Sequence, residues 1–467
     1  MLLHPNRFFD PHPDIRQLAR ALYEEIKDTP ILSPHGHVEA SWFADNQPFA
    51  DPTELLLLPD HYLLRLLYSQ GVSLESLGVQ PKDDAPYQQD RKQAWIQFAK
   101  HYYLFDGTPS GAWFDYELST LFGIEERLSE DNAEALYDQI NEALQTPAFR
   151  PRALFDSFNV EVLSTTNGAT DPLIHHQTLQ DSEWNGRILP CLRPDDVLNL
   201  HHPQWKQNVE TLSSLSGIDI HDYTTFLQAL EERRDFFRKQ GAVSTDHGVE
   251  SVMTAQLSQQ EVSALFTRAL KGEANEEDNH RFSGHMLIEM ARMSVEDGMT
   301  MQIHPGSFRN HNKDVYRRFG PDKGSDIPLP MDYTRGLHAL LNAFGNDHRF
   351  KLVLFTLDES TYSRELAPLA GHYPALHVGP AWWFHDSYQG MKRFRQMIWE
   401  TASIYNTVGF IDDTRALLSI PARHDLARRM DCDFLARLVC THIIDEQQAR
   451  RMLTALTYDL TKKVYQL

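Results

Sequence analysis

Short apolar runs recur along the chain, and each run is bounded by polar or turn-forming residues. Eight of them have the length and composition of buried strands, namely residues 31–35, 160–166, 187–192, 241–246, 299–304, 350–356, 375–379 and 407–412. Segments with apolar residues at helical spacing separate these runs, as at Leu136, Ile140 and Leu144. Strands that alternate with helices predict a parallel sheet, and eight such units predict an α/β fold of the (β/α)8 TIM-barrel type.

The spacing between the first and second predicted strands is much longer than the rest. About 125 residues lie between them, and this segment carries leucine-rich and aromatic helical patterns. It contains no low-complexity stretch, Gly/Ser linker or internal repeat. We interpret residues 38–158 as a helical insertion that caps the barrel mouth, and residues 1–467 as a single domain.

The composition disfavours several classes of partner. A net charge of −21 argues against nucleic acid and against anionic membrane surfaces, which both require basic patches. Three scattered cysteines are too few for a disulfide framework. The sequence shows neither a signal-peptide pattern nor an apolar run of roughly 18 residues. We therefore expect a cytoplasmic protein whose partner is a small molecule.

Polar side chains gather where the predicted strands end, which is where barrel enzymes carry their chemistry. His35 and His37 follow the first strand at i and i+2, so that both imidazoles lie on one face. Asp413 follows the last strand, which lies beside the first in a closed barrel. Two histidines and one carboxylate predict a catalytic divalent-metal site with open coordination positions. A chance His-x-His pair is the alternative, and Asp412 is expected to cap the next helix.

Further candidates follow the other predicted strands. His304 could bind a metal, contact a substrate or be a hydrogen-bonded core histidine. Arg193 and Arg415 could clamp an anion, or could pair with acids of neighbouring loops. Trp382 and Trp383 could pack in the core or face a sugar ring. These residue types together favour a site for an anionic small molecule.

Two other motifs carry weaker signals. Asp246 and His247 end the fourth predicted strand, where they could belong to the site or only form a turn. His61, Tyr62 and Arg65 begin a predicted helix in the insertion. Their spacing alone is typical of a solvated helix face.

Six motifs occur in order from about residue 5 to the C-terminus, and together they are far more specific than any one of them. They are Pro34-His35-Gly36-His37; Pro59-Asp60-His61-Tyr62 with Arg65 and Gly71-Val72; Arg193-Pro194-Asp195; Ile303-His304-Pro305-Gly306 with Arg309-Asn310; Trp382-Trp383-Phe384; and Gly409 to Arg415 with Leu418-Ser419. In these motifs the chain resembles the uronate isomerase (glucuronate isomerase) family, an outlying branch of the amidohydrolase superfamily.

The resemblance implies a metal-assisted barrel that interconverts D-glucuronate with D-fructuronate and D-galacturonate with D-tagaturonate. It implies one divalent ion, which we expect to be zinc (Zn2+), on His35, His37 and Asp413. It also implies that Tyr62 is a catalytic tyrosine, and that His35 and Asp413 are catalytic as well. We further expect a homo-oligomer. The implied substrate contacts are His61, Arg193, His304, Trp382 or Trp383, Arg415 and, at an uncertain register after the sixth strand, Arg364.

The residue types fit the chemistry of an aldose–ketose isomerase. Hydrogen moves from C2 to C1 through an enediol or by a hydride shift, and the first route needs a base and a group that stabilises an oxyanion. Tyr62 can be that base if positive charge or Asp413 helps its proton leave, because the reference pKa of a phenol is about 10. A metal ion can stabilise charge on sugar oxygens, and arginines select a uronate over a neutral aldose.

Two alternative functions stay open at this point. A mononuclear metal-dependent hydrolase or decarboxylase of the same superfamily would share the metal site, whereas a binuclear centre is disfavoured because no histidine follows the sixth strand. A non-catalytic sugar-acid-binding protein would need the arginines but neither the metal nor Tyr62. The sequence does not decide which uronate is preferred.

Overall fold

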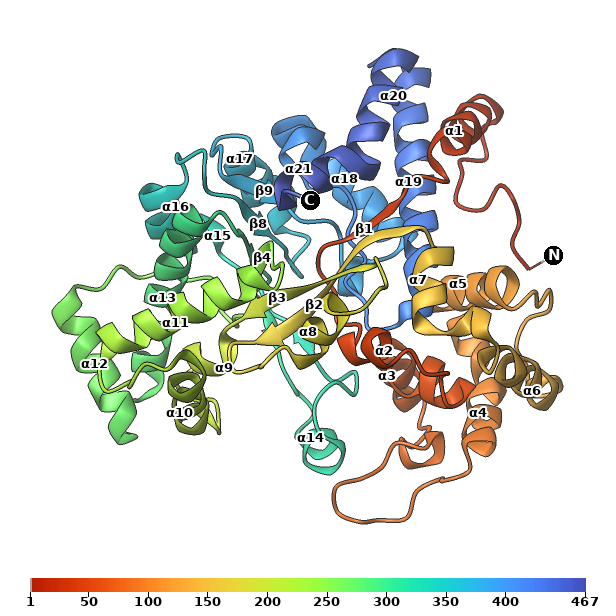
Figure 1. The fold of residues 1–467 in the computed structure, drawn as a ribbon. Helices are drawn as coiled ribbons and strands as arrows, with labels where there is room; N and C mark the ends of the chain where they lie inside the picture. The colour runs from red at the N-terminus through yellow and green to blue at the C-terminus, as the bar shows by residue number, and fades with distance from the viewer. Residues whose placement is uncertain (1) are drawn as a thin grey trace.

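A curved parallel sheet forms the centre of the molecule in a computed structural model. The structure describes residues 2–467, so Met1 of the predicted domain 1–467 lies outside the described residues. The seven strands of the sheet are ordered β1-β2-β3-β4-β5-β8-β9 and pair with their neighbours in parallel, which confirms seven of the eight predicted strands (Figure 1). The bounds are β1 (Ile31–Ser33), β2 (Val160–Gly168), β3 (Arg187–Arg193), β4 (Ser244–His247), β5 (Thr300–Ile303), β8 (Leu352–Leu354) and β9 (Leu376–Val378). A separate antiparallel pair, β6 (Ser307–Phe308) and β7 (Ile327–Pro328), follows β5.

The expected eighth strand, residues 407–412, is not formed, and this prediction is corrected to seven regular strands. Thr407 makes one isolated bridge to Val378 of β9. Further along, the carbonyl oxygen of Thr414 accepts a hydrogen bond of 2.9 Å from the amide of His37, just after β1. The segment therefore contacts both edges of the sheet through isolated hydrogen bonds and not through a ladder.

Backbone conformation explains why this segment is irregular. Gly409 has a φ of 78° and Asp413 a φ of 39°, both in the left-handed region that interrupts an extended strand. Apolar residues in the same segment remain buried, as Val408 and Ile411 show. The apolar run thus predicted burial correctly, whereas two left-handed residues prevent a continuous ladder.

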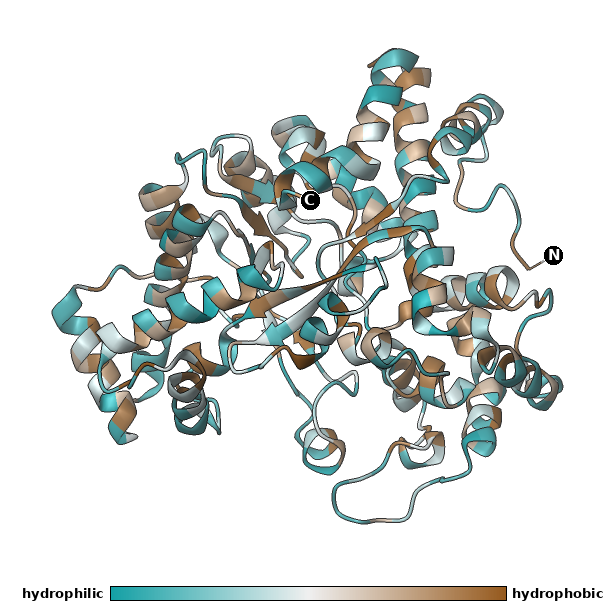
Figure 2. Cartoon of the chain, in the orientation of Figure 1, coloured by the Kyte–Doolittle hydropathy of each residue, from teal (hydrophilic) through white to brown (hydrophobic). Residues whose placement is uncertain are grey.

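Helices follow the strands and cover the outer face of the sheet. Figure 2 shows hydrophobic colour along the central strands and mixed colour on the helices, as expected for amphipathic helices on a buried sheet. None of the helices in residues 2–467 combines the length and hydropathy needed to cross a membrane. The helices outside residues 34–159 are α1 (Pro13–Ile26), α8 (Ile174–Gln180), α9 (Asp195–Leu198), α10 (Trp205–Ser216), α11 (Tyr223–Lys239), α12 (Gln259–Lys271), α13 (Glu276–Asp297), α14 (Lys313–Phe319), α15 (Tyr333–Gly336), α16 (His338–Phe344), α17 (Ala367–Ala370), α18 (Tyr388–Ala402), α19 (Ile420–Cys440), α20 (Glu446–Thr454) and α21 (Leu460–Tyr465).

The segment between β1 and β2 is helical and shares its core with the sheet. Trp95 and Phe98 are buried in it, and the same apolar cluster includes Ile31 of β1 and Val160 of β2. In Figure 1 these helices, coloured from red-orange to yellow, gather at the right of the view, and α5 among them contacts α19. Their bounds are α2 (Ala40–Asp45), α3 (His61–Ser69), α4 (Arg91–Lys100), α5 (Pro109–Tyr116), α6 (Ala133–Leu144) and α7 (Pro151–Ser157).

Candidate active site

A cavity lies at the ends of the strands, between the sheet and the first turn of α3. It brings together most of the residues predicted from the sequence, and it adds several charged residues that the sequence analysis gave no role. Predicted residues that line it are His37, His61, Tyr62, Arg193, His304, Trp382, Trp383, Asp413 and Arg415; additional charged ones are Asp60, Arg65, Arg309, Asp322, Asp326 and Arg423. Strand ends supply one wall, and helices and loops supply the other.

Asp413 joins the two histidines that follow β1. Its Oδ1 lies 3.4 Å from Nε2 of His35 and 3.3 Å from Nε2 of His37. Burial alone would raise the pKa of Asp413, but His35 and His37 hold that pKa far below its usual range. Oδ1 of Asp413 and Nδ1 of His35 are buried and have no hydrogen-bond partner. Two imidazoles and a carboxylate oxygen within 4.8 Å of one another fit the donor set of a divalent metal.

Asp412, the neighbour of Asp413, does not cap a helix, contrary to the prediction. It is buried, accepts a hydrogen bond of 2.7 Å from Oγ of Ser33, and lies 3.2 Å from Nε2 of His424. The next long helix, α19, begins only at Ile420. Asp412 instead ties β1 to α19, which holds the backbone before Asp413 in place.

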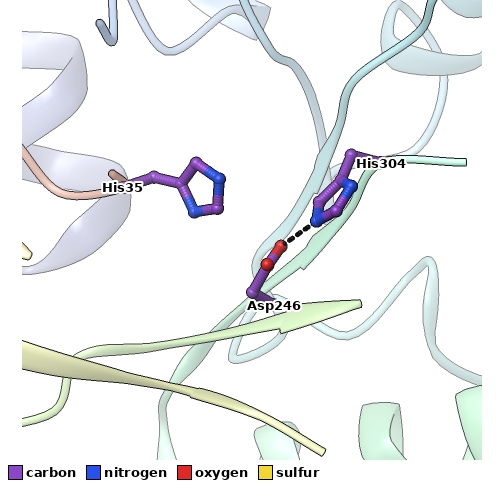
Figure 3. Close-up of side chains that lie close together, drawn as sticks. All are labelled: His35, Asp246 and His304. Carbon is purple, nitrogen blue, oxygen red and sulfur yellow. Dashed lines mark ion pairs between the residues drawn. The ribbon is translucent and has the colours of Figure 1, made fainter. Parts of the chain in front are cut away.

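A second group of potential ligands shares His35 with the first. Asp246 of β4 is fully buried, and its Oδ1 lies 2.7 Å from Nε2 of His304 (Figure 3). Its other oxygen lies 3.6 Å from the guanidinium of Arg193. Burial would raise the pKa of Asp246, yet His304, His35 and Arg193 together hold it well below its usual value. Asp246 is therefore an ionised acceptor inside the site and not a turn residue.

Arg193 is held in a fixed orientation at the end of β3. Its Nε donates to Oδ2 of Asp195 over 2.7 Å, and the same carboxylate oxygen accepts a bond from the amide of Gly248. The guanidinium thus lies between Asp195 and Asp246, the two acids that compete for it. An anionic ligand would add a third negative group to this cation.

The first turn of α3 directs His61 and Tyr62 into the cavity. Asp60 caps the helix by accepting from the amides of Tyr62 and Leu63 over 2.8 and 3.1 Å. The rings of His61 and Tyr62 stack with their centroids 4.4 Å apart. Burial raises the pKa of Tyr62 and lowers that of His61 to about 3, so His61 is neutral at physiological pH. The spacing had indicated a solvated face, and the structure corrects this because the insertion folds back over the sheet.

Arginines also line the outer part of the cavity. Arg415 pairs with Asp322 at 3.0 Å, and Arg309 pairs with Asp326 at 2.8 Å. Arg309 had no role in the sequence analysis, although it belongs to a quoted motif. Arg364, in contrast, does not line the cavity: its side chain is 59% exposed and pairs with the adjacent Glu365.

The two tryptophans after β9 have different surroundings. Trp382 is buried, donates its Nε1 hydrogen to the carbonyl oxygen of Thr356 over 3.1 Å, and contacts the His304 ring. Trp383 is less buried, with the Arg309 guanidinium 5.0 Å from its ring centroid and His61 at its edge. Trp382 thus supports the strand ends, whereas Trp383 joins α3 to the arginines.

Comparison with known proteins identifies relatives over the whole chain. The family model described as glucuronate isomerase matches residues 14–465. Uronate isomerase of Brucella canis is 51% identical over 467 residues, which cover all of both chains. Uronate isomerase of Rhizorhabdus wittichii is 52% identical over 465 residues, covering 100% of this chain and 98% of the relative.

Solved structures agree with these sequence matches. The crystal structure of glucuronate isomerase from Caulobacter crescentus has a TM-score of 0.97 and 51% identity, covering 99% of this chain and 97% of that one. Uronate isomerase from Thermotoga maritima has a TM-score of 0.92 and 28% identity over the full length of both chains. A metal-dependent hydrolase structure from Lactobacillus casei, at 14% identity and a TM-score of 0.53, shares the fold alone.

Proposed function

The chain belongs to the glucuronate isomerase family, and from this premise we propose how its residues carry out the reaction. The protein is an aldose–ketose isomerase that acts on uronates. We propose D-glucuronate and D-galacturonate as the aldoses, and D-fructuronate and D-tagaturonate as the ketoses. The observation that carries the residue roles is one cavity lined by His37 and Asp413 of the metal-ligand set, a half-buried tyrosine and several arginines.

The proposed cofactor is one divalent ion, zinc, held by His35, His37 and Asp413. Support comes from the donor types and from the unpartnered buried atoms of His35 and Asp413. When bound, such an ion supplies Lewis acidity toward the oxygens of the sugar. His304 and Asp246 lie next to this set and share His35 with it, and we assign this pair to the substrate.

Arg193 and Arg415 are the proposed partners of the C6 carboxylate. A guanidinium forms strong, charge-assisted hydrogen bonds with a carboxylate in a fixed geometry. Arg415 is paired with Asp322 in the protein alone, so a uronate carboxylate can replace a protein carboxylate at that position. This exchange favours uronates over neutral aldoses, which lack the negative group.

Tyr62 is the proposed base. As a phenolate it removes the proton from C2 of the open-chain aldose, and the electron pair of that C–H bond forms the C1–C2 double bond of an enediolate whose negative charge lies on O1. The hydroxyl proton of O2 passes to O1, and the phenol returns the C2 proton to C1, so the C1 aldehyde is reduced to an alcohol while C2 is oxidised to a ketone, with no external oxidant. Asp246, ionised between His304 and Arg193, accepts a hydrogen bond from a sugar hydroxyl.

We propose that residues 1–467 act as one unit and that residues 38–158 cap the sheet. The buried cluster shared by the insertion and the first strands supports this division. Cytoplasmic location and homo-oligomeric assembly stay predictions.

Incubation of the purified protein with each uronate, followed by NMR, tests the proposed substrates. We expect the matching ketose from D-glucuronate and from D-galacturonate. In D2O, an enediol route places deuterium at C1 unless a shielded base returns the same hydrogen. No ketose from either sugar would contradict the proposal, and hydrolysis or decarboxylation of a sugar acid instead would favour the alternative superfamily functions.

A further inference from the structure

A buried guanidinium from α19 contacts Tyr62. Cζ of Arg423 lies 5.6 Å from the centroid of the Tyr62 ring and 3.7 Å from that of Trp113. The two rings also meet edge to face, with centroids 5.7 Å apart. Arg423 is 2% exposed and lines the same cavity. A cation at an aromatic face is attracted to the ring, and this attraction is stronger when the cation is desolvated.

Hydrogen bonds fix the orientation of Arg423. Its NH1 donates to Oδ2 of Asp386, and its Nε donates to Oγ of Ser419 over 3.0 Å. Asp386 is 2% exposed, and its other carboxylate oxygen has no hydrogen-bond partner. Burial raises the pKa of Asp386 to about 6, and Arg423 opposes that rise. A buried ion pair of this kind costs desolvation energy, so it is weak evidence of a purely stabilising role.

We propose that Arg423 is a positioning residue for the reaction: it holds the Tyr62 ring against Trp113 and supplies the positive charge that favours loss of the phenolic proton. The inference rests on the proposed role of Tyr62 as the base. It deepens that role by naming the group through which a half-buried phenol can give up its proton.

The charges around Tyr62 show why a cation is needed there. Burial is the largest influence on the Tyr62 pKa and raises it, and Arg423 is the largest influence that lowers it. Asp386 from the loop before α18, Asp413 from the sheet side and Asp60 from its own helix all raise this pKa further. Without Arg423, three carboxylates would face the phenol and oppose its ionisation.

Other titratable groups near this pair do not replace Arg423. His61 is stacked on Tyr62 but is neutral at physiological pH. Arg65 interacts with Tyr62 from the next turn of α3, yet its guanidinium lies over the Phe384 ring at 4.7 Å. Glu117 faces Arg423, and burial raises its pKa to about 8, so it is largely uncharged near neutral pH.

The choice of variants must avoid leaving a buried carboxylate unpaired. Arg423→Met alone would strand Asp386, so the charge pair is removed as Arg423→Met/Asp386→Asn. Arg423→Lys keeps the charge and loses the fork of the guanidinium. The matched control is Arg395→Met/Asp431→Asn, because this second buried Arg–Asp pair joins α18 to α19 outside the cavity, with N–O distances of 2.7 and 3.0 Å.

The test measures kcat and KM for D-glucuronate from pH 6 to 10, a range that rises to the reference phenol pKa of about 10, in the wild-type and in the Tyr62→Phe background. With Tyr62 present, we expect Arg423→Met/Asp386→Asn to lower kcat at least about tenfold near pH 7 relative to Asp386→Asn alone, which corresponds to one pKa unit; the single variant is the reference because Asp386 itself raises the Tyr62 pKa. KM changes little, and the rise of kcat with pH shifts to higher pH. Arg423→Lys restores part of the loss, and the control pair changes neither parameter.

The Tyr62→Phe background separates a positioning role from a merely structural one. There, Arg423→Met/Asp386→Asn is expected to change kcat by less than about twofold, because the group through which it acts is absent. Equal losses in both backgrounds, or an unchanged kcat with Tyr62 present, would overturn the inference. If the double variant does not fold, Arg423→Lys in the two backgrounds gives the same comparison. A near-normal kcat for Tyr62→Phe alone would instead refute Tyr62 as the base, and the inference with it.

Discussion

The strand ends and the helical insertion contribute to one cavity in different ways. His35, Asp246 and His304 lie on or directly after parallel strands and are at most 5% exposed, so the sheet fixes their positions. Tyr62 lies on α3, and a helix cap, a stacked ring and a buried guanidinium hold it. Residues of the first kind are fixed by the backbone, whereas Tyr62 depends on side-chain contacts between separate elements.

This difference indicates a division of labour. The strand ends gather the ionised acids and imidazoles that bind a metal or a hydroxyl, and these groups must be close together before any substrate arrives. The insertion brings the proposed base, whereas the arginines that meet the substrate carboxylate come from the end of β3 (Arg193) and from the loop after Asp413 (Arg415). Loss of the two histidines after β1 is therefore expected to remove the cofactor, and loss of the tyrosine or of an arginine to affect turnover or substrate binding.

The largest effect is expected from the strand-end ligands. His35→Ala/His37→Ala should lose about one equivalent of bound zinc and lower kcat by more than about 10³-fold, because a Lewis-acid ion contributes several kcal/mol to the reaction. Elemental analysis and NMR assays measure both effects. His377→Ala removes a buried histidine of β9 outside the cavity and should keep the metal. Equal metal contents in the two variants would eliminate the proposed site.

Tyr62→Phe sharpens the comparison, because it should separate chemistry from metal binding. We expect kcat to fall by about 10²- to 10⁴-fold, the range for general acid–base catalysis, with normal metal content and normal thermal unfolding. Tyr102→Phe is the control. This buried tyrosine of the insertion lies outside the cavity, and its hydroxyl donates a hydrogen bond of 2.9 Å to Asp115. A Tyr62→Phe enzyme with wild-type turnover would show that the insertion does not carry the base.

The arginines should affect substrate binding more than metal content. Arg193→Met or Arg415→Met is expected to lower kcat/KM for uronates by about 10²-fold, the effect of losing a charge-assisted bond of roughly 1.5–3 kcal/mol. Arg364→Met, at an exposed position, should change kcat/KM less than twofold, on the order of a surface pair. Steady-state kinetics decide the point, and wild-type values for both cavity variants would place the carboxylate clamp elsewhere.

The smallest effect on catalysis is expected from Glu117, which instead governs stability in the insertion. Burial raises the pKa of Glu117 from 4.5 to about 8, so the folded protein keeps this proton at pH values where the unfolded chain has lost it. The resulting stabilisation is present below pH 4.5 and disappears as the pH rises to about 8. Glu117→Gln removes this dependence, so its free energy of unfolding should improve relative to wild type as the pH rises from 5 to 8.

Urea denaturation at several pH values measures this trend. The exposed Glu134→Gln is the control and should follow wild type throughout. If Glu117→Gln also follows wild type, Glu117 is ionised in the folded protein. It would then add a negative charge beside Arg423, contrary to the uncharged state inferred above.

The sequence predicted the strand-end half of the site from its own physics. Alternation along a strand predicted that His35 and His37 share a face; β1 ends at Ser33, yet both imidazoles meet Asp413, which the neighbouring last strand segment brings to them. Asp246 was the ambiguous case, because an aspartate before a histidine and a glycine is also a turn pattern. Its inward direction depends on the pairing of β4 with β5, which no local pattern contains.

The helix-borne half could not be predicted in the same way. Tyr62 occupies a position that local spacing assigns to solvent, and only the family resemblance indicated its role. Arg423 lies in a helix whose residues are buried on almost every side. The apolar pattern of this helix therefore does not mark a buried arginine as a functional residue. Both positions are decided by how α3 and α19 meet, which is a tertiary contact.

The hydrogen bond from Ser33 to Asp412 joins residues that are 379 positions apart in the chain. Contacts of such long range form late, because the entropy cost of closing a large loop comes before the contact stabilises the fold. During synthesis, the first strand and its histidines therefore leave the ribosome long before their acidic partner exists. An early imidazole pair without that partner is only a weak metal site, so tight metal uptake should coincide with completion of the chain.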